Sequence, residues 1–231
     1  MITIRKAQAR GHANHGWLDS YHTFSFADYY DANFMGFSAL RVINEDVIDA
    51  GQGFGTHPHK DMEILTYVLS GTVEHQDSMG NKAQIPAGEF QIMSAGTGVR
   101  HSEYNASSDV PLHLYQIWIL PEKSGLPPRY AQRRFERVKG PQLVLSPDAR
   151  EGSLKVCQDM TLSRWTLVPG ESGQIQIDAG RRIWIQIVNG DISVNGKAAT
   201  TSDAFAVWDE SELHISASAD AEILLFDLPP V

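Results

Sequence analysis

Ten residues in the first half of the chain decide the fold class: Ile64-Leu65-Thr66-Tyr67-Val68-Leu69-Ser70-Gly71-Thr72-Val73. They form an apolar run rich in β-branched residues, a polar-glycine turn and the start of a second run, a pattern that predicts two strands joined by a tight turn. The same order returns at Ile183-Trp184-Ile185-Gln186-Ile187-Val188-Asn189-Gly190-Asp191-Ile192. A second echo follows in each half, with Gly80-Asn81-Lys82 and Pro86-Ala87-Gly88 matched by Gly196-Lys197-Ala198 and Ser202-Asp203-Ala204. Two echoes in one order favour an internal duplication.

Similar short runs occur throughout the chain, separated by 19 glycines and 11 prolines, and few stretches carry a helical apolar stripe. Strands are predicted at 36–44, 63–69, 90–94, 112–120, 183–188 and 222–227. The spacing predicts an all-β protein of two tandem barrels or sandwiches. We expect a first domain at 1–125, a charged, proline-led linker at 126–140 and a second domain at 141–231.

Hydrophobic content and net charge argue against several classes of function. The 231 residues are 42% hydrophobic, enough for a sizeable core, and their formal charge of -9 repels nucleic acid and anionic membrane surfaces. No direct nucleic-acid partner and no membrane partner are therefore expected. The single cysteine, Cys157, fits a reducing compartment, and neither a secretory signal nor a run of about 18 apolar residues is visible. The chain is expected in the cytoplasm.

Histidines carry the chemical signal. His57-Pro58-His59 and His101-Ser102-Glu103 each place two metal-binding side chains at i and i+2, on one face of a strand and about 7 Å apart. A lone His-x-His is more often an ordinary surface or core pair. If the two segments lie on neighbouring strands, however, three imidazoles and one carboxylate meet at one point. The second half offers only His214, followed by Ile215-Ser216, so a structural role is favoured there.

Glycines and an acid surround these pairs: Gly51, Glu63, Gly71, Gly80 and the run Pro86-Ala87-Gly88. Together they resemble the two motifs of the cupin superfamily. Four longer stretches resemble the pirin family of cupins: residues 20–30 (SYHTFSFADYY), 37–44 (FSALRVIN), 55–59 (GTHPH) and 96–103 (GTGVRHSE). The resemblance runs along most of the chain and is strongest at residues 11–121.

This resemblance implies a bicupin, with a mononuclear metal in the first cupin held by His57, His59, His101 and Glu103, and a second cupin without metal. Bacterial pirins of this kind are associated with quercetin 2,3-dioxygenase activity. Two departures from the general cupin pattern matter. Gln91 stands where the second motif usually carries a ligand, and Glu63 is the usual carboxylate of the first motif. The resemblance to pirins and the i+2 spacing from His101 together favour Glu103 as the ligand.

A nitrogen and oxygen ligand set without sulfur favours a redox-capable divalent ion, with Fe(II) ahead of manganese, nickel, copper and zinc. The resemblance implies a flavonol substrate and O2, with Glu103 as the catalytic base that accepts the proton of the 3-hydroxyl and carbon monoxide as a product. The alternative is an iron-binding, redox-responsive regulator that acts on a protein partner. A metal-free structural cupin ranks third.

Aromatic residues gather at Phe24, Phe26, Tyr29, Tyr30, Phe34 and Phe37. Such a run is able to line a flavonoid-sized cavity, although aromatic clusters are more often core, so it is not assigned to the site. His12, His15, His22, His75 and His113 are each expected to make ordinary hydrogen bonds.

Overall fold

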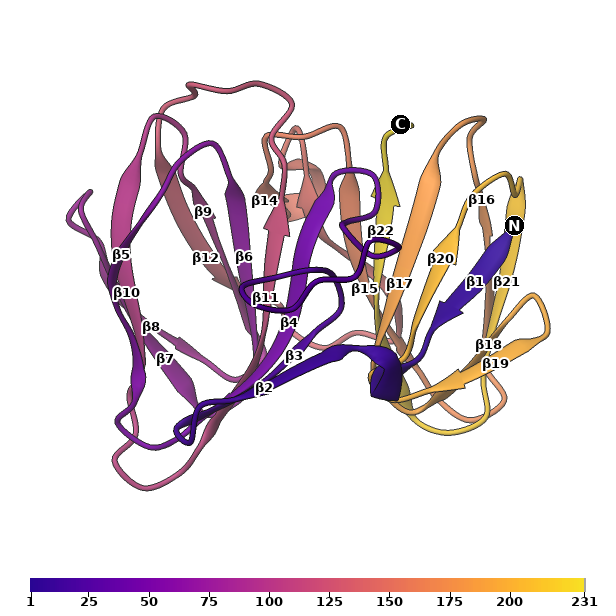
Figure 1. Cartoon of the computed structure of the whole chain (residues 1–231). Helices are drawn as coiled ribbons and strands as arrows, with labels where there is room; N and C mark the ends of the chain where they lie inside the picture. Colours follow the sequence, from indigo (N-terminus) through magenta and orange to yellow (C-terminus); the bar gives the residue numbers. More distant parts are fainter. Residues whose placement is uncertain (231) are drawn as a thin grey trace. The chain divides into compact units, whose positions relative to one another are not determined.

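Short alternating segments between turns give the chain an almost wholly β structure, which the computed structural model describes for residues 1–230 (Figure 1). The helical content of these residues is two 3-10 turns, η1 (Ala7–Ala9) and η2 (Arg150–Gly152). None of the helices in this part of the chain is long and apolar enough to cross a membrane. The strands fall into two compact units, and the expected all-β class is confirmed.

The first unit comprises Gly11–Phe135 and Val156–Gln158. Its larger sheet has the order β12-β9-β6-β11-β4-β3-β2. The bounds in that order are Arg129–Arg134, Glu89–Ser94, Glu63–Ser70, Leu112–Ile119, Leu40–Ile48, Leu18–His22 and Gly11–Asn14. The smaller sheet has the order β5-β10-β7-β8, with bounds Gly53–His59, Val99–Asn105, Thr72–Asp77 and Lys82–Pro86.

Apolar side chains from both sheets of this unit meet in one buried cluster, which includes Val68 and Leu114 of the larger sheet and Val73 and Ile85 of the smaller one. The two sheets therefore pack face to face, as in a jelly roll. All their strand pairs are antiparallel, so inward and outward side chains alternate along each strand.

The second unit comprises Met1–Arg10, Glu136–Lys155 and the chain from Asp159 onward. Its larger sheet has the order β1-β20-β17-β22-β15-β13-β14. The bounds in that order are Ile2–Arg5, Ala204–Val207, Arg182–Asn189, Ala221–Leu228, Thr161–Leu167, Gly140–Ser146 and Leu154–Lys155. The smaller sheet has the order β16-β21-β18-β19, with bounds Ser172–Gln176, Glu212–Ala217, Asp191–Val194 and Lys197–Thr200.

The duplication read from the sequence reappears as matching strand orders. The central strands β9-β6-β11-β4 of the first unit correspond to β20-β17-β22-β15 of the second, and the smaller sheets correspond strand for strand. The two quoted ten-residue stretches, 64–73 and 183–192, lie at the equivalent pairs β6–β7 and β17–β18. Two related β-domains are therefore present, each built from two packed sheets.

The unit boundaries differ from the expected 1–125, 126–140 and 141–231 at three places, one of which is the short segment Val156–Gln158 in the first unit. Strand β1 pairs with β20 and so completes the second unit, where Ile2 and Ile4 pack against its core; Figure 1 shows this indigo strand beside β20. The expected linker contains β12, which pairs with β9 of the first unit. An edge strand carries charges on its free side, so the arginines of β12 gave its sequence the character of a linker.

Two strand boundaries also reflect local chemistry. The strand expected at 36–44 begins only at Leu40, because Ser38 takes a left-handed φ of 51° in the preceding turn; at its other end it continues to Ile48. The charged pair Glu45-Asp46 lies inside this strand, β4, rather than beyond its end.

Candidate metal centre

Strands β5 and β10 bring the two histidine pairs together. They are antiparallel neighbours, with His101 opposite His57 and Val99 opposite His59. The ring centroids of His57, His59 and His101 lie 4.5 to 4.8 Å from one another. Their ligand nitrogens all lie within 4.8 Å, so one ion is able to reach all three.

Hydrogen bonds define the free nitrogens of this cluster. The Nδ1–H of His57 donates to the carbonyl of Gly55 at 2.8 Å, which leaves Nε2 of His57 as an acceptor. Nε2 of His101 lies 3.0 Å from that atom and therefore donates to it, while the buried Nδ1 of His101 has no hydrogen-bond partner. A cation at the two Nε2 atoms would replace the shared proton, so the donor set fits a metal.

Burial keeps the imidazoles of His59 and His101 neutral. It lowers the pKa of His59 to about 4 and, with the neighbouring imidazoles, lowers the pKa of His101 to about 3. Neutral imidazole is the form that binds metal, so these two ligands need not lose a proton at pH 7.

Glu103 is buried beside the histidines and is held from the larger sheet. Thr66 donates its hydroxyl to Oε1 at 3.2 Å, and the amide of Gln116 donates to Oε2 at 2.7 Å. Glu103 groups with His101 and His75, its carboxylate oxygen lying within 4.8 Å of a ring nitrogen of each. Two overlapping groups thus share His101, and together they contain all four expected site residues.

His101 and Glu103 both face inward, opposite a bulge in the neighbouring strand β5. The register between β10 and β5 shifts between these two residues, so His101 pairs with His57 but Glu103 pairs with Phe54. The burial of β10 still alternates, with Arg100 and Tyr104 exposed. The i, i+2 placement expected from the sequence is therefore observed on β10.

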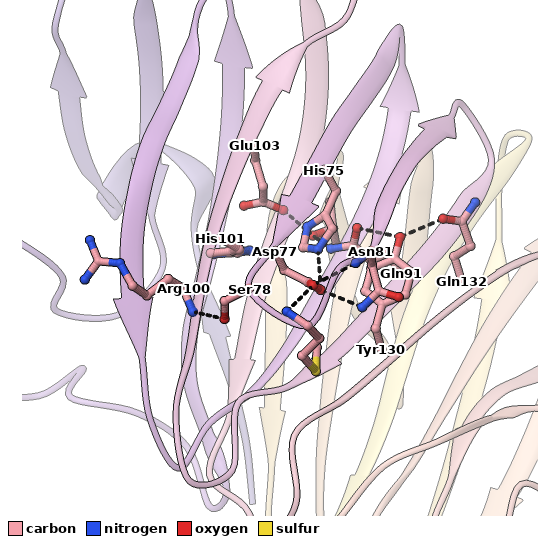
Figure 2. Close-up of polar contacts among 12 residues, drawn as sticks. His75, Asp77, Ser78, Asn81, Gln91, Arg100, His101, Glu103, Tyr130 and Gln132 are labelled. Atoms are coloured by element: carbon pink, nitrogen blue, oxygen red, sulfur yellow. Dashed lines mark hydrogen bonds and ion pairs between the residues drawn. The ribbon is translucent and has the colours of Figure 1, made fainter.

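His75 and Asp77 form a second layer behind His101 (Figure 2). The fully buried His75 donates from Nε2 to Asp77 at 3.0 Å and stacks on Tyr130 at 4.8 Å. Burial raises the pKa of Asp77, but hydrogen bonds from His75 and Asn81 outweigh it and hold that pKa below the usual value. Nδ1 of His75 has no hydrogen-bond partner among the described residues.

A cavity of about 720 Å³ opens in front of the cluster, within the range of sites for drug-sized ligands, about 300–1,000 Å³. Aromatic and apolar side chains form much of its wall, namely Trp17, Leu18, Phe26, Tyr29, Phe54 and Trp118. His57, His59 and Glu103 also line it, so the candidate ligands face a space of substrate size. Phe26 and Tyr29 show that part of the aromatic run does reach the cavity, whereas Tyr30 is exposed.

The alternative carboxylate, Glu63, is engaged elsewhere. It accepts hydrogen bonds from the hydroxyl of Ser94 at 2.9 Å and from the backbone of Cys157 at 3.1 Å. Arg129 lies 3.7 Å away. These contacts satisfy Glu63 within the core and leave Glu103 as the carboxylate beside the histidines.

In the second unit, β21 is the equivalent of β10. Its inward residues are Leu213 and Ile215, while His214 points outward and lies 2.5 Å from Glu212. Both candidate metal groups found in residues 1–230 belong to the first unit.

Comparisons with known proteins agree with this geometry. A family model described as Pirin matches residues 3–119, and one described as Quercetinase C-terminal cupin domain matches residues 143–228. The chain belongs to the pirin family. This pirin is 73% identical to the quercetin 2,3-dioxygenase of Escherichia coli K12, over all of both chains. It is 38% identical to a pirin-like protein of Caulobacter vibrioides, over 98% of this chain and 99% of that one.

Solved structures extend the match. The crystal structure of YhhW from Escherichia coli has a TM-score of 0.99 and 73% identity and covers 100% of this pirin and 99% of that chain. The same bacterial pirin in complex with nickel(II) has a TM-score of 0.98 and 72% identity, with both chains covered completely. A metal-binding pirin fold is thus established for this chain, and the predicted family is confirmed.

Several residues of the site escaped the sequence reading. Thr66 and Gln116 hold Glu103, and Asn44 and Asp46 line the cavity, yet each is a polar residue inside an apolar strand. Their position inside an apolar strand is the one sequence feature that indicates such residues, because a polar side chain at a core-facing position needs a hydrogen-bond partner. The expected side-chain hydrogen bonds are present for His12, His22, His75 and His113, for example between His113 and Glu45 at 3.1 Å.

Proposed function

We propose that this pirin is a metal-dependent quercetin 2,3-dioxygenase, which cleaves the heterocyclic ring of a flavonol with O2 and releases carbon monoxide. In this proposal one divalent ion is held by His57, His59, His101 and Glu103. The observation that carries it is the cluster of three close imidazoles, with Glu103 beside it, opening into an aromatic cavity. The relative from Escherichia coli, named quercetin 2,3-dioxygenase, supports the assignment of the substrate.

The ion, the carboxylate and the aromatic wall have separate roles in the proposed reaction. When bound, the ion supplies positive charge for a deprotonated flavonol hydroxyl and a redox-active centre for dioxygen. Glu103 accepts the proton of the 3-hydroxyl as general base, and Thr66 and Gln116 hold its carboxylate in place. Trp118 packs edge-on against His59 at 5.0 Å and, with Phe54, excludes water from the aromatic substrate.

We propose Fe(II) as the ion. The nitrogen and oxygen ligand set without sulfur suits redox-capable divalent ions in general, and iron is the one most often used with oxygen among the candidates Fe, Mn, Ni, Cu and Zn. Nickel(II) is the ion named for the Escherichia coli pirin structure. Metal analysis of protein purified without added metal distinguishes these ions.

The substrates are a small flavonol-like molecule and O2. The net charge of -9 opposes direct contact with nucleic acid and with anionic membranes. The one cysteine, Cys157, is not in a disulfide, which agrees with the cytoplasm as the place of action.

The test is aerobic consumption of quercetin by protein of known metal content, followed through loss of the flavonol absorbance, with carbon monoxide collected. We expect metal-dependent turnover that His101→Ala abolishes together with bound metal. The matched control is His214→Ala, which removes an exposed histidine from the equivalent strand of the second unit and should leave turnover unchanged. Bound metal with no loss of flavonol would reject the dioxygenase and favour the redox-responsive regulator of a protein partner.

A further inference from the structure

A row of polar side chains crosses the larger sheet of the first unit beneath the cavity. The strand registers place Gln91, Thr66, Gln116, Asn44 and His22 directly opposite one another on β9, β6, β11, β4 and β3. Neighbouring strands lie about 4.8 Å apart. Asn44 is therefore one strand away from Gln116, the residue that holds Glu103.

Asp46 extends this row along β4. It lies at i+2 from Asn44, on the same face, and opposite Ser20 of β3. Both Asn44 and Asp46 are 3% exposed and line the cavity. A carboxyl and an amide thus share a wall that is otherwise largely aromatic.

In each of these two side chains, one of the two polar atoms forms a hydrogen bond and the other does not. The hydroxyl of Ser20 donates to Oδ1 of Asp46, and Nδ1–H of His22 donates to Oδ1 of Asn44 at 2.9 Å. Among residues 1–230, the other polar atoms, Oδ2 of Asp46 and Nδ2 of Asn44, have no hydrogen-bond partner. Neither atom is among the fully buried atoms without a partner, so both are open to the cavity, where a ligand or water is able to complete their hydrogen bonds.

The hydrogen bonds of Ser20 and His22 determine which polar atom of Asn44 faces the cavity. Ser20 donates its one hydroxyl proton to Asp46, so its oxygen accepts from His22, whose Nδ1 lies 3.4 Å away. Nδ1 of His22 therefore carries the proton, and Asn44 presents its oxygen to it and its NH2 to the cavity. Burial, together with the neighbouring carboxylates of Glu103 and Glu45, raises the pKa of Asp46 to about 7.

We propose that Asn44 and Asp46 are a hydroxyl-recognition pair that makes the cavity select polyhydroxylated aromatic substrates over unsubstituted ones. Oδ2 of Asp46 accepts a hydrogen bond from one phenolic hydroxyl, and Nδ2 of Asn44 donates to the oxygen of another. The inference rests on the proposed function for the bound position of the substrate, beside Glu103 and the three histidines. It adds the residues that determine which flavonol is preferred.

The test is a binding titration of the metal-loaded protein without oxygen. Trp17 and Trp118 line the cavity, so quenching of tryptophan fluorescence reports occupancy. The two probes are quercetin and 3-hydroxyflavone, which keeps the metal-binding hydroxyl and carbonyl but lacks the remaining hydroxyls. The quantity measured is the ratio of their dissociation constants, which a general loss of folding or of metal would not change selectively.

We expect the parent protein to bind quercetin at least about tenfold more tightly than 3-hydroxyflavone. Asp46→Ala and Asn44→Ala should each reduce that preference by about tenfold, since each removes one hydrogen bond to the substrate. The matched control is Glu45→Gln, on the same strand but directed at His113 and Tyr115, which should keep the parent's preference. Near-ultraviolet circular dichroism and metal content report the integrity of each variant.

Two results would overturn the inference: a parent protein without preference, or a preference that survives in both variants, as expected if water alone completes these atoms. Failure of the dioxygenase proposal is a separate result, namely no turnover of either flavonol in air. The binding ratio is measured without oxygen and remains interpretable in that case.

Discussion

Hydrogen bonds to single nitrogen and oxygen atoms fix the side chains of the candidate metal centre. His57 is fixed by its hydrogen bond to Gly55, and Glu103 is fixed by donors from two strands of the opposite sheet. Side chains behind the ligands commonly change metal affinity or activity about 10- to 100-fold. The residues that hold Glu103 should therefore matter nearly as much as Glu103 itself.

Replacement of the amide donor tests this. Gln116→Leu removes the 2.7 Å hydrogen bond to Glu103 while filling similar space, and we expect the rate of quercetin consumption to fall about 10- to 100-fold with the fold retained. Steady-state kinetics with metal-loaded protein make the measurement. The control is Tyr115→Phe, the preceding residue on β11, which contacts Glu45 instead. Equal rates for Gln116→Leu and the parent would show that Glu103 is positioned without this donor.

Asp46 gives a pH dependence of stability. Its pKa is raised by burial from 3.8 to about 7 in the folded protein. Below about pH 4 the carboxyl is protonated in both states; above this pH the unfolded chain ionises first, so its contribution to stability is lost as pH rises to about 7. Three pKa units correspond to roughly 4 kcal/mol.

Asp46→Asn should remove this loss. We expect the free energy of unfolding of the variant, minus that of the parent, to increase between about pH 4 and pH 7 and then level off. Urea denaturation across this range, with Glu45→Gln as the control, provides the comparison. A difference that does not vary with pH would contradict the raised pKa.

The sequence predicted which histidines and which carboxylate lie together, but not the residues that surround them. The spacing of His57-Pro58-His59 and His101-Ser102-Glu103 was sufficient because strand geometry places i and i+2 on one face. Asp46 was missed because the charges of Glu45 and Asp46 made that segment resemble the end of a strand. Only the fold shows that Asp46 points into a cavity.

The pairing of β5 with β10 is the element that positions the candidate ligands. Gly53 allows the two strands to approach closely at the bulge, since a Cβ there would lie 2.3 Å from the backbone oxygen of Glu103. At Gly55 a Cβ would meet only the hydroxyl of Tyr104, at 3.7 Å. The same strand therefore contains one glycine that is required and one that is not.

Gly53→Ala should force β5 away from β10 and cost about 1–3 kcal/mol of stability. We expect a melting temperature lowered by several degrees and a lower metal content, because His57 and His101 would separate. Gly55→Ala should retain both properties. Thermal denaturation with and without added metal tests the pair, and equal behaviour of the two variants would rule out the close approach.

Strands were predictable where apolar alternation was strong and less so at the sheet edges. The runs at 63–69 and 112–120 correspond closely to β6 and β11, which are central strands. The sequence of β12 predicts a linker because an edge strand carries charged residues and little apolar alternation. The identity of the neighbouring strand is a tertiary property that the local pattern does not contain.

For the whole molecule, the duplication has produced two barrels with one set of close histidines. The repeat was visible in the sequence because the central strands keep their apolar pattern in both halves. The pairing of β1 with the second unit was not predictable from the sequence, because Ile2 and Ile4 have no feature that distinguishes one apolar core from the other.

The contribution of β1 to the second unit is testable. The double variant Ile2→Ser and Ile4→Ser should weaken its packing on the core by about 2 kcal/mol, roughly a thirtyfold faster hydrogen exchange. We expect the change in peptides covering β17 and β20, with β9 and β11 of the first unit unaffected. Thr3→Ser, at an exposed position between them, is the control. Faster exchange spread equally over both units would contradict the assignment of β1.

The position of β1 also orders events during translation. Its partner β20 begins at Ala204, about two hundred codons later, and at about 5–20 residues per second roughly 10 to 40 s pass before the two strands can meet. Residues 11–135 emerge within that interval and contain the sheets of the first unit, whereas the opening strand has no partner on the ribosome. A nascent chain arrested before Ala204 therefore leaves residues 2–5 unpaired, however well its first unit has folded.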